Sequence, residues 1–196
     1  AGATIEITPT EMMPAGLTAR FAFSKDSDAG DTNDKTAGGD SGALGSGWDL
    51  TLEAGSDLHG VDGLTLYGGM SEVDQFQNAG SVSGDVSEQV LGIKYAMGSF
   101  TVGYQQTDEE TGLTSGTDYE NTSYGITFNV NDDLSIGYAH TESTETGQSL
   151  PDAEADSLQA SYTYGGATIS IAEVDVENGG YSTSAANDKS GTVIYL

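Results

Sequence analysis

The sequence predicts an all-β protein, an antiparallel up-and-down β-barrel that crosses a membrane, and three observations lead to this fold class. Apolar and polar residues alternate with period two along most of the chain, whereas no segment shows a convincing period of 3.6. One series in this alternation holds large apolar side chains, and the other holds mostly Gly, Ser, Thr, Asn and a few charges. The connections between the alternating segments are short and long in turn.

The alternating segments place the strands. Strands are expected at about 3–8, 16–24, 47–54, 63–71, 88–97, 99–106, 118–130, 134–143, 156–164, 167–176 and 191–196. The stretch YGITFNVNDDLSIGYAHT (124–141) is typical, because two alternating runs flank an acidic turn. In 167–176 the pattern changes: Ile169 and Ile171 share one face, and Val174 and Val176 share the other. This change predicts a β-bulge or register change near Glu173.

The connections predict how the strands cross the membrane. Short ones fall at 9–15, 55–62, 97–99, 131–133 and 165–166, and long acidic ones at 25–46, 72–87, 107–117, 143–155 and 177–190. A barrel inserted across a membrane has tight turns on one side and long loops on the other. A soluble sandwich with Greek-key crossings has no reason to follow that rule. Residues 1–196 are therefore expected to form a single transmembrane domain.

Composition limits the partners. The 196 residues include 31 acidic and 5 basic side chains, a formal net charge of -26, which argues against binding nucleic acid or anionic lipid head groups. Cysteine is absent, so the sheet relies on hydrogen bonding and burial. No apolar run approaches the roughly 20 residues of a membrane helix. The mean hydropathy of -0.32 suits a barrel, because only alternate strand residues face lipid.

Four segments resemble alphaproteobacterial outer-membrane general porins: EMMPAGLTARFAF (11–23), MGSFTVGYQQTD (97–108), TSYGITFNVNDDLSIGYAHTE (122–142) and ASYTYGGATISIAEVDVENGG (160–180). The resemblance runs across nearly the whole chain and includes no invariant catalytic motif. It implies a barrel of 16 strands, a homotrimer, and a water-filled channel for passive diffusion of ions and small hydrophilic solutes. It also implies a location in the bacterial outer membrane, with membrane lipid and lipopolysaccharide as partners.

The chain supplies only about 11 of those 16 strands. One hypothesis is that it is the C-terminal two-thirds of such a porin, lacking the first strands and the last few residues. A structural alternative is a complete ten-stranded barrel from Gly16 to Leu196, with Ala1–Ala15 as a plug or periplasmic tail. Functional alternatives are a soluble or cell-surface acidic all-β module with a structural or adhesive role, and an outer-membrane barrel enzyme.

The small polar series predicts the wall of the channel. Arg20 and Lys94 are the basic residues inside confident strands, and they are expected to face acids such as Asp49 and Glu53. Opposed charges across a pore create a transverse field that orients polar solutes, and the excess of acids predicts weak cation selectivity. The other residues expected to line the pore are Thr18, Thr51, Thr101, Gln105, Thr127 and Asn129.

Aromatic residues near the ends of the apolar series predict two interfacial girdles. Those toward the short turns are Tyr95, Phe100, Phe128, Tyr162 and Tyr164, and those toward the long loops include Tyr104 and Tyr138.

No catalytic residue, metal site or cofactor is predicted, and the protein is not expected to be an enzyme. Calcium binding by Asp26, Asp28, Asp31 and Asp34 is considered, but their spacing matches no EF-hand, so a solvated acidic loop is favoured. His59 is assigned to a surface turn. His140 continues the apolar series past Tyr138, and an interfacial ring is preferred over a catalytic role.

Overall fold

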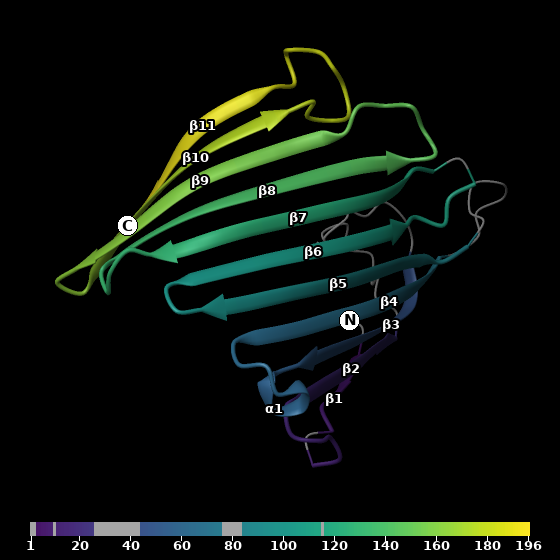
Figure 1. Ribbon diagram of the computed structural model, residues 1–196. Helices are drawn as coiled ribbons and strands as arrows, with labels where there is room; N and C mark the ends of the chain where they lie inside the picture. Colours follow the sequence, from purple (N-terminus) through teal and green to yellow (C-terminus); the bar gives the residue numbers. More distant parts are fainter. Residues whose placement is uncertain (1–2, 10, 26–43, 76–83, 115) are drawn as a thin grey trace. The chain divides into compact units, whose positions relative to one another are not determined.

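The protein is described by a computed structural model in which residues 3–9, 11–25, 44–75, 84–114 and 116–196 are placed (Figure 1). These residues form one antiparallel sheet of eleven strands whose spatial order follows the chain order from β1 to β11. The all-β, antiparallel, up-and-down prediction is confirmed. The elements are β1 Ala3–Ile7, β2 Leu17–Lys25, β3 Leu44–Ala54, α1 Ser56–His59, β4 Leu64–Gln75, β5 Val86–Met97, β6 Phe100–Glu110, β7 Asp118–Asn129, β8 Leu134–Thr146, β9 Ala153–Tyr164, β10 Ala167–Glu177 and β11 Lys189–Tyr195.

The chain divides into two compact units, each of which repeats the same two-faced construction. The first unit comprises Ala1–Leu91 with Thr107–Glu120, and the second comprises Gly92–Gln106 with Asn121–Leu196. Antiparallel pairing places residues that are opposite one another on the same face of the sheet. The register can therefore be followed row by row within each unit.

In the first unit, one row across β1 to β4 joins Ile7, Phe21, Leu50 and Met70. The adjacent row on the opposite face joins Glu6, Ala22, Asp49 and Ser71. We call the face that contains the first row the apolar face and the face that contains the second row the small-polar face. The rings of Phe21 and Trp48 stack on the apolar face, with their centroids 6.5 Å apart.

In the second unit, Ile136, Ala160, Ile171 and Ile194 form a row of the apolar face across β8 to β11. The pairing of β9 with β10 runs without a shift from Ala167 to Glu177, so the predicted bulge near Glu173 is wrong. Val174 and Val176 lie on the small-polar face, and Glu173, Asp175 and Glu177 lie on the other. The side-chain pattern of β10 therefore changes near its long-loop end, whereas its backbone pairing with β9 stays regular.

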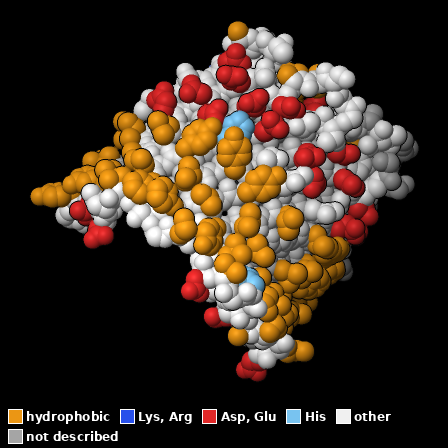
Figure 2. Space-filling view, viewed as in Figure 1, with side chains coloured by type: hydrophobic (Ala, Val, Ile, Leu, Met, Phe, Trp, Pro, Cys, Tyr) orange, Lys and Arg blue, Asp and Glu red, His pale blue; other side chains and the backbone are white. Residues whose placement is uncertain are grey.

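Large apolar side chains are exposed rather than packed in a core. Among the described residues, Ala19 and Ala22 are the buried hydrophobic side chains, and Leu91 and Leu158 are 71% and 64% exposed. Figure 2 shows apolar side chains in a broad exposed area, with carboxylates gathered beside it. A soluble sandwich covers its apolar face with a second sheet. The burial pattern therefore does not fit that alternative and fits a sheet whose apolar face meets lipid.

The ten-stranded alternative is also wrong. Residues 3–7 form β1, which pairs with β2 from Ala3 opposite Lys25 to Ile7 opposite Phe21, so this part of 1–15 is neither a plug nor a tail. Within the described residues, β1 and β11 are the two ends of the sheet, and no pairing closes it.

One element was not expected from the sequence. Residues Ser56–His59 form a single helical turn in the connection between β3 and β4, which had been assigned as a turn. Gly60 ends it in the left-handed region, with φ of 74°, which favours glycine. Four residues are too few to show a 3.6-residue period. No helix among the described residues is long and apolar enough to cross a membrane.

Candidate functional site

The small-polar face of the first unit brings together most of the charged residues predicted to line a pore. Arg20 lies opposite Thr51 in the register, and its Nε is 3.3 Å from Oε1 of Glu6 on β1. The two side chains are 58% and 52% exposed, so the ion pair is well hydrated. Asp49 and Glu53 lie opposite Ala22 and Thr18, which places them at the two diagonal positions next to Arg20.

Glu6 is the residue of this group that sequence reasoning missed. The alternation in ATIEI places it on the face opposite Ile5 and Ile7, so the signal was present. In the ten-stranded alternative this segment is a plug or tail, and that alternative gives Glu6 no cross-strand neighbour.

The remaining residues predicted to line the pore lie in the second unit. Lys94 is exposed on β5, and within the described residues it has no ion-pair partner. Thr101 and Gln105 are half-buried on β6, and Thr127 and Asn129 are exposed on β7. Their role in a pore stays a prediction.

Hydroxyl groups pair across the strands of this unit. Oγ of Ser161 lies 2.8 Å from Oγ of Ser170, and Oγ1 of Thr163 lies 2.9 Å from Oγ1 of Thr168. Each pair joins β9 to β10 on the small-polar face. A surface of hydroxyl pairs accepts and donates hydrogen bonds to water without a fixed charge.

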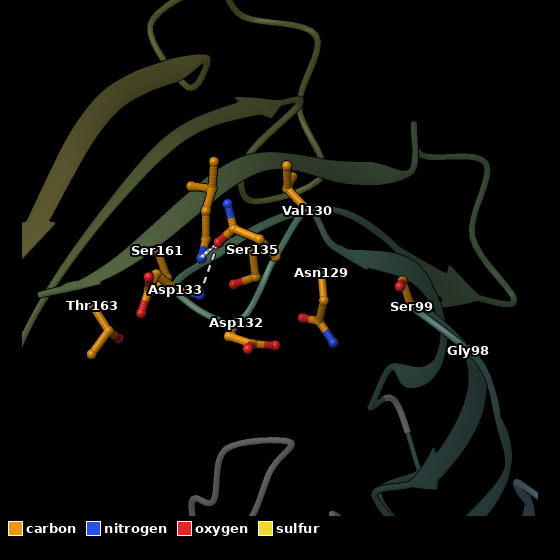
Figure 3. A pocket seen from close by; sticks show the side chains of 11 residues that line it. Gly98, Ser99, Asn129, Val130, Asp132, Asp133, Ser135, Ser161 and Thr163 are labelled. Atoms are coloured by element: carbon orange, nitrogen blue, oxygen red, sulfur yellow. Dashed lines mark hydrogen bonds between the residues drawn. The ribbon is translucent and has the colours of Figure 1, made fainter.

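A polar pocket of about 430 Å³ lies at the short-turn end of the second unit (Figure 3). The turn beside it is stabilised by Asn131, whose Oδ1 accepts hydrogen bonds of 2.9 Å from the backbone N–H groups of Asp133 and Leu134. This polar recess can hold water or a small hydrophilic solute. Its lining includes Ser99, Asn129, Asp132, Asp133, Ser135, Ser161 and Thr163.

The residues predicted to form aromatic girdles lie mostly exposed. The rings of Phe100 and Phe128 stack with centroids 4.5 Å apart, which joins β6 to β7 near their short-turn ends. Tyr95 is half-buried. The exposed tyrosines are Tyr104, Tyr138, Tyr162 and Tyr164. Their interfacial role stays a prediction.

His140 belongs to a polar and aromatic cluster that sequence reasoning missed. Its Nδ1 lies 3.0 Å from Oδ1 of Asp156, which is its cross-strand partner on β9. The hydroxyl of Tyr138 donates to the same carboxylate, and the ring of Tyr124 stacks on the imidazole at 5.0 Å. The cluster depends on the register of β8 against β9, which the sequence alone does not specify.

The other candidates for chemistry are simpler. His59 is half-buried, and its Nδ1 accepts a 3.2 Å hydrogen bond from the N–H of Val61. Its Nε2 is buried and has no hydrogen-bond partner among the residues that the structure describes. The four aspartates considered for calcium, Asp26, Asp28, Asp31 and Asp34, lie outside the described residues. Within the part of the chain that the structure describes, no group of three or more His, Asp or Glu side chains could hold a metal ion.

No protein-family model matches the chain, and no curated protein matches it in sequence. Solved structures do match. The chain is similar to outer-membrane expressed OmpT of Vibrio cholerae, with a TM-score of 0.62 and 13% identity over 97% of this chain and 60% of that one. It is also similar to in-vitro folded OmpT, an outer membrane protein of Vibrio cholerae, with a TM-score of 0.58, 15% identity, and coverage of 97% and 59%. The chain thus spans about 60% of the length of these structures.

These neighbours correct one expectation and support another. The expectation that the protein is not an enzyme is corrected: the chain shares its fold with proteins named OmpT, and this shared fold does not exclude catalytic activity. The expected location in the bacterial outer membrane is supported, since both neighbours are outer-membrane proteins. The chain has the fold of an outer-membrane β-barrel protein.

Proposed function

We propose that the protein forms the wall of a water-filled channel through which ions and small hydrophilic solutes diffuse across the bacterial outer membrane. The observation that supports this most directly is the difference between the two faces of the sheet. Large apolar side chains such as Leu91 and Leu158 are exposed on one face. Small hydroxyl residues, glycines and hydrated charges make up the other. Lipid suits the first face, and water suits the second.

The charged residues would act by sorting solutes. The pair of Arg20 and Glu6, with Asp49 and Glu53 diagonal to Arg20, places both signs of charge on one stretch of wall. Such a wall produces a local electric field across the lumen. This field orients dipolar solutes and makes the passage of ions depend on their charge. Because acids outnumber bases by 31 to 5, the expected preference is for cations.

We further propose that the eleven strands belong to a larger closed barrel of the general porin type. An unpaired strand edge in lipid leaves backbone groups without partners, each at a cost of about several kcal/mol. The partial coverage of the neighbours, about 60% of their length, is consistent with this. The same proposal includes a single domain over 1–196, a barrel of 16 strands, a homotrimer and contact with lipopolysaccharide. These parts of the proposal rest on the sequence resemblance.

Planar bilayers test the channel. The protein extracted from membranes in detergent should insert and produce conductance steps that scale with salt, and a KCl gradient should produce a reversal potential of cationic sign. Asp49→Asn, on the small-polar face, should reduce that potential. Glu72→Gln is the matched control, because Glu72 lies opposite Trp48 on the apolar face. Absence of conductance, or an anionic sign, would contradict the proposal.

A second candidate function, hydrolysis at the outer face of the membrane, is favoured by the cluster around His140. An imidazole bonded to a carboxylate is the base and orienter of many hydrolases. Phospholipid, ester and peptide substrates should be screened against the protein in mixed micelles. An activity that His140→Ala abolishes and His59→Ala preserves would support this function, and the absence of any turnover would refute it.

A further inference from the structure

Three carboxylates meet where β5, β6 and β7 reach their long loops. Glu109 lies on β6 and is only 7% exposed, the one buried charged side chain among the described residues. β5 and β6 are joined by the turn Gly98–Ser99. Glu88 lies as many residues before this turn as Glu109 lies after it, so the hairpin places the two residues opposite each other. Asp118 begins β7, the other neighbour of β6.

The predicted aromatic girdle places this cluster outside the lipid band. Glu109 is five residues beyond Tyr104, the aromatic residue of β6 toward the long loop, which is about 16 Å along a strand. Burial raises the pKa of the Glu109 carboxyl above its ordinary value, and the charges of Glu88 and Asp118 raise this pKa further. Glu88 and Asp118 are the groups on the neighbouring strands whose charges act on the Glu109 carboxyl, and residues 76–83 include no ionisable side chain.

The carboxylates lie beside a junction between two connections. The N–H of Gly84 donates a 3.0 Å hydrogen bond to the carbonyl of Gly112, so the residues before β5 contact those after β6. Nε2 of Gln75 donates to the carbonyl of Thr111, and the N–H of Thr111 donates a 2.8 Å bond to Oδ1 of Asp118. Asp118 is therefore part of both the acidic cluster and the junction.

Glycine is required at the centre of this junction. Gly112 has φ of +63°, and a Cβ there would lie 2.5 Å from the carbonyl oxygen of Gly84. The close backbone approach lets the N–H of Gly84 reach the carbonyl of Gly112. A small change in the spacing of β5, β6 and β7 would be enough to weaken that bond.

We propose that Glu109 is a proton-controlled latch that fastens the junction of residues 84–85 with 111–112 in acid and loosens it as the pH rises. When Glu109 takes a proton from solvent, its neutral carboxyl can donate a hydrogen bond to a carboxylate of Glu88 or Asp118. When the proton is lost, three negative charges repel one another at the ends of three adjacent strands. If the protein is the proposed channel, the same switch changes the packing of its outer loops with pH.

The direction of the pH dependence follows from proton linkage. A carboxyl whose pKa is higher in the closed junction than in the open one binds its proton more tightly when the junction is closed. Closing is therefore most favourable below the ordinary range of glutamate. It becomes less favourable as the pH rises through the raised pKa of Glu109.

Hydrogen exchange at the amide of Gly84 tests the latch in the detergent-solubilised protein. Protection, corrected for intrinsic exchange rates, should be highest below the ordinary range of glutamate and should fall as the pH rises through the raised pKa of Glu109, by roughly tenfold for each unit by which the pKa is raised. Glu109→Gln should keep protection high and independent of pH. Glu110→Gln, an exposed neighbour on the same strand, should keep the wild-type profile.

Two results would overturn the proposal: protection of Gly84 that does not change with pH in the wild type, or an equal flattening in Glu110→Gln. If Glu109→Gln does not fold, carboxyl NMR of the wild type replaces it, and a pKa at or below the ordinary value for Glu109 refutes the latch. Exchange requires no ion flow, so its failure differs from failure of the channel. A protein that conducts in bilayers but shows flat exchange would retain the channel and lose the latch.

Discussion

The two ends of the strands carry different kinds of side chain on the same face, although one ladder of backbone hydrogen bonds runs through both. Toward the short turns, β8 to β10 present Ile136, Ala160 and Ile171 on the apolar face, and small hydroxyl residues on the other. Toward the long loops, the same face of the same strands presents Glu142, Glu154 and Glu177 in one row. The row of like charges needs water around it.

This contrast shows that backbone pairing and side-chain alternation have different origins. Pairing forms the strand, whereas alternation reflects the surroundings of its two faces. The backbone pairing of β9 with β10 continues through both regions without a register shift. The alternation of apolar and polar side chains marks only the part of the sheet that has different surroundings on its two faces. Where both faces meet water, strands are stabilised by side-chain hydrogen bonds, such as those of Ser143 to Asn121 and Tyr181.

The largest effect on stability is expected when the same positive charge is introduced in each of the two regions of β9. Leu158→Arg lies on the apolar face of β9, opposite Tyr138 of the predicted girdle, and should lower the free energy of unfolding by about 1–2 kcal/mol, because the cost of a charge falls from the middle of the lipid toward its edge. Glu154→Arg lies on the same face, four residues nearer the long loop, and should change it by at most about 1 kcal/mol. Urea unfolding from lipid vesicles measures both.

A soluble sheet would respond differently. Because Leu158 is 64% exposed, its replacement by Arg in water should change stability by no more than about 0.5 kcal/mol. Equal, small effects of Leu158→Arg and Glu154→Arg would therefore contradict the assignment of the apolar face to lipid.

The same contrast explains how much of the fold could be predicted. The existence, order and antiparallel pairing of the strands were predictable, because two-residue alternation is strong where lipid and water lie on opposite faces. The ends of the strands toward the long loops were not. β4 runs to Gln75, β6 to Glu110 and β8 to Thr146, each several residues past its predicted end. Apart from Val73, the added residues are polar on both faces, so no period marks them as strand.

The candidate site was predictable to a similar degree. Alternation alone places Arg20, Asp49 and Glu53 on one face, and the register agrees. Pairings that depend on which residues lie opposite each other were not predictable, since the lengths of the long loops leave that register open. Asp156 opposite His140, and Asp118 near Glu109, are examples. Glu6 could have been found, because the alternation in its own strand was regular.

A smaller effect is expected when a side-chain hydrogen bond is removed near the long loops, where apolar and polar residues no longer alternate. Ser143→Ala removes a hydroxyl that donates to Oδ1 of Asn121 and lies 2.8 Å from the hydroxyl of Tyr181, and it should cost about 1 kcal/mol. Ser157→Ala, at a half-buried serine on the same pair of strands, should cost less, because no side-chain hydrogen bond of Ser157 is found within the described residues. Thermal unfolding in detergent compares the two. An equal cost would mean that these polar contacts contribute nothing specific.

The smallest effect is expected on the small-polar face, at the ion pair between Arg20 and Glu6. Both side chains are more than half exposed, and hydrated pairs of this kind contribute about 0–1 kcal/mol. A double-mutant cycle with Arg20→Gln and Glu6→Gln should therefore give a coupling energy below about 1 kcal/mol, and the coupling should fall further as salt is added. A larger coupling that salt does not reduce would mean that the pair is shielded from water. In that case the small-polar face would be packed against other protein, and it could not be the wall of an aqueous channel.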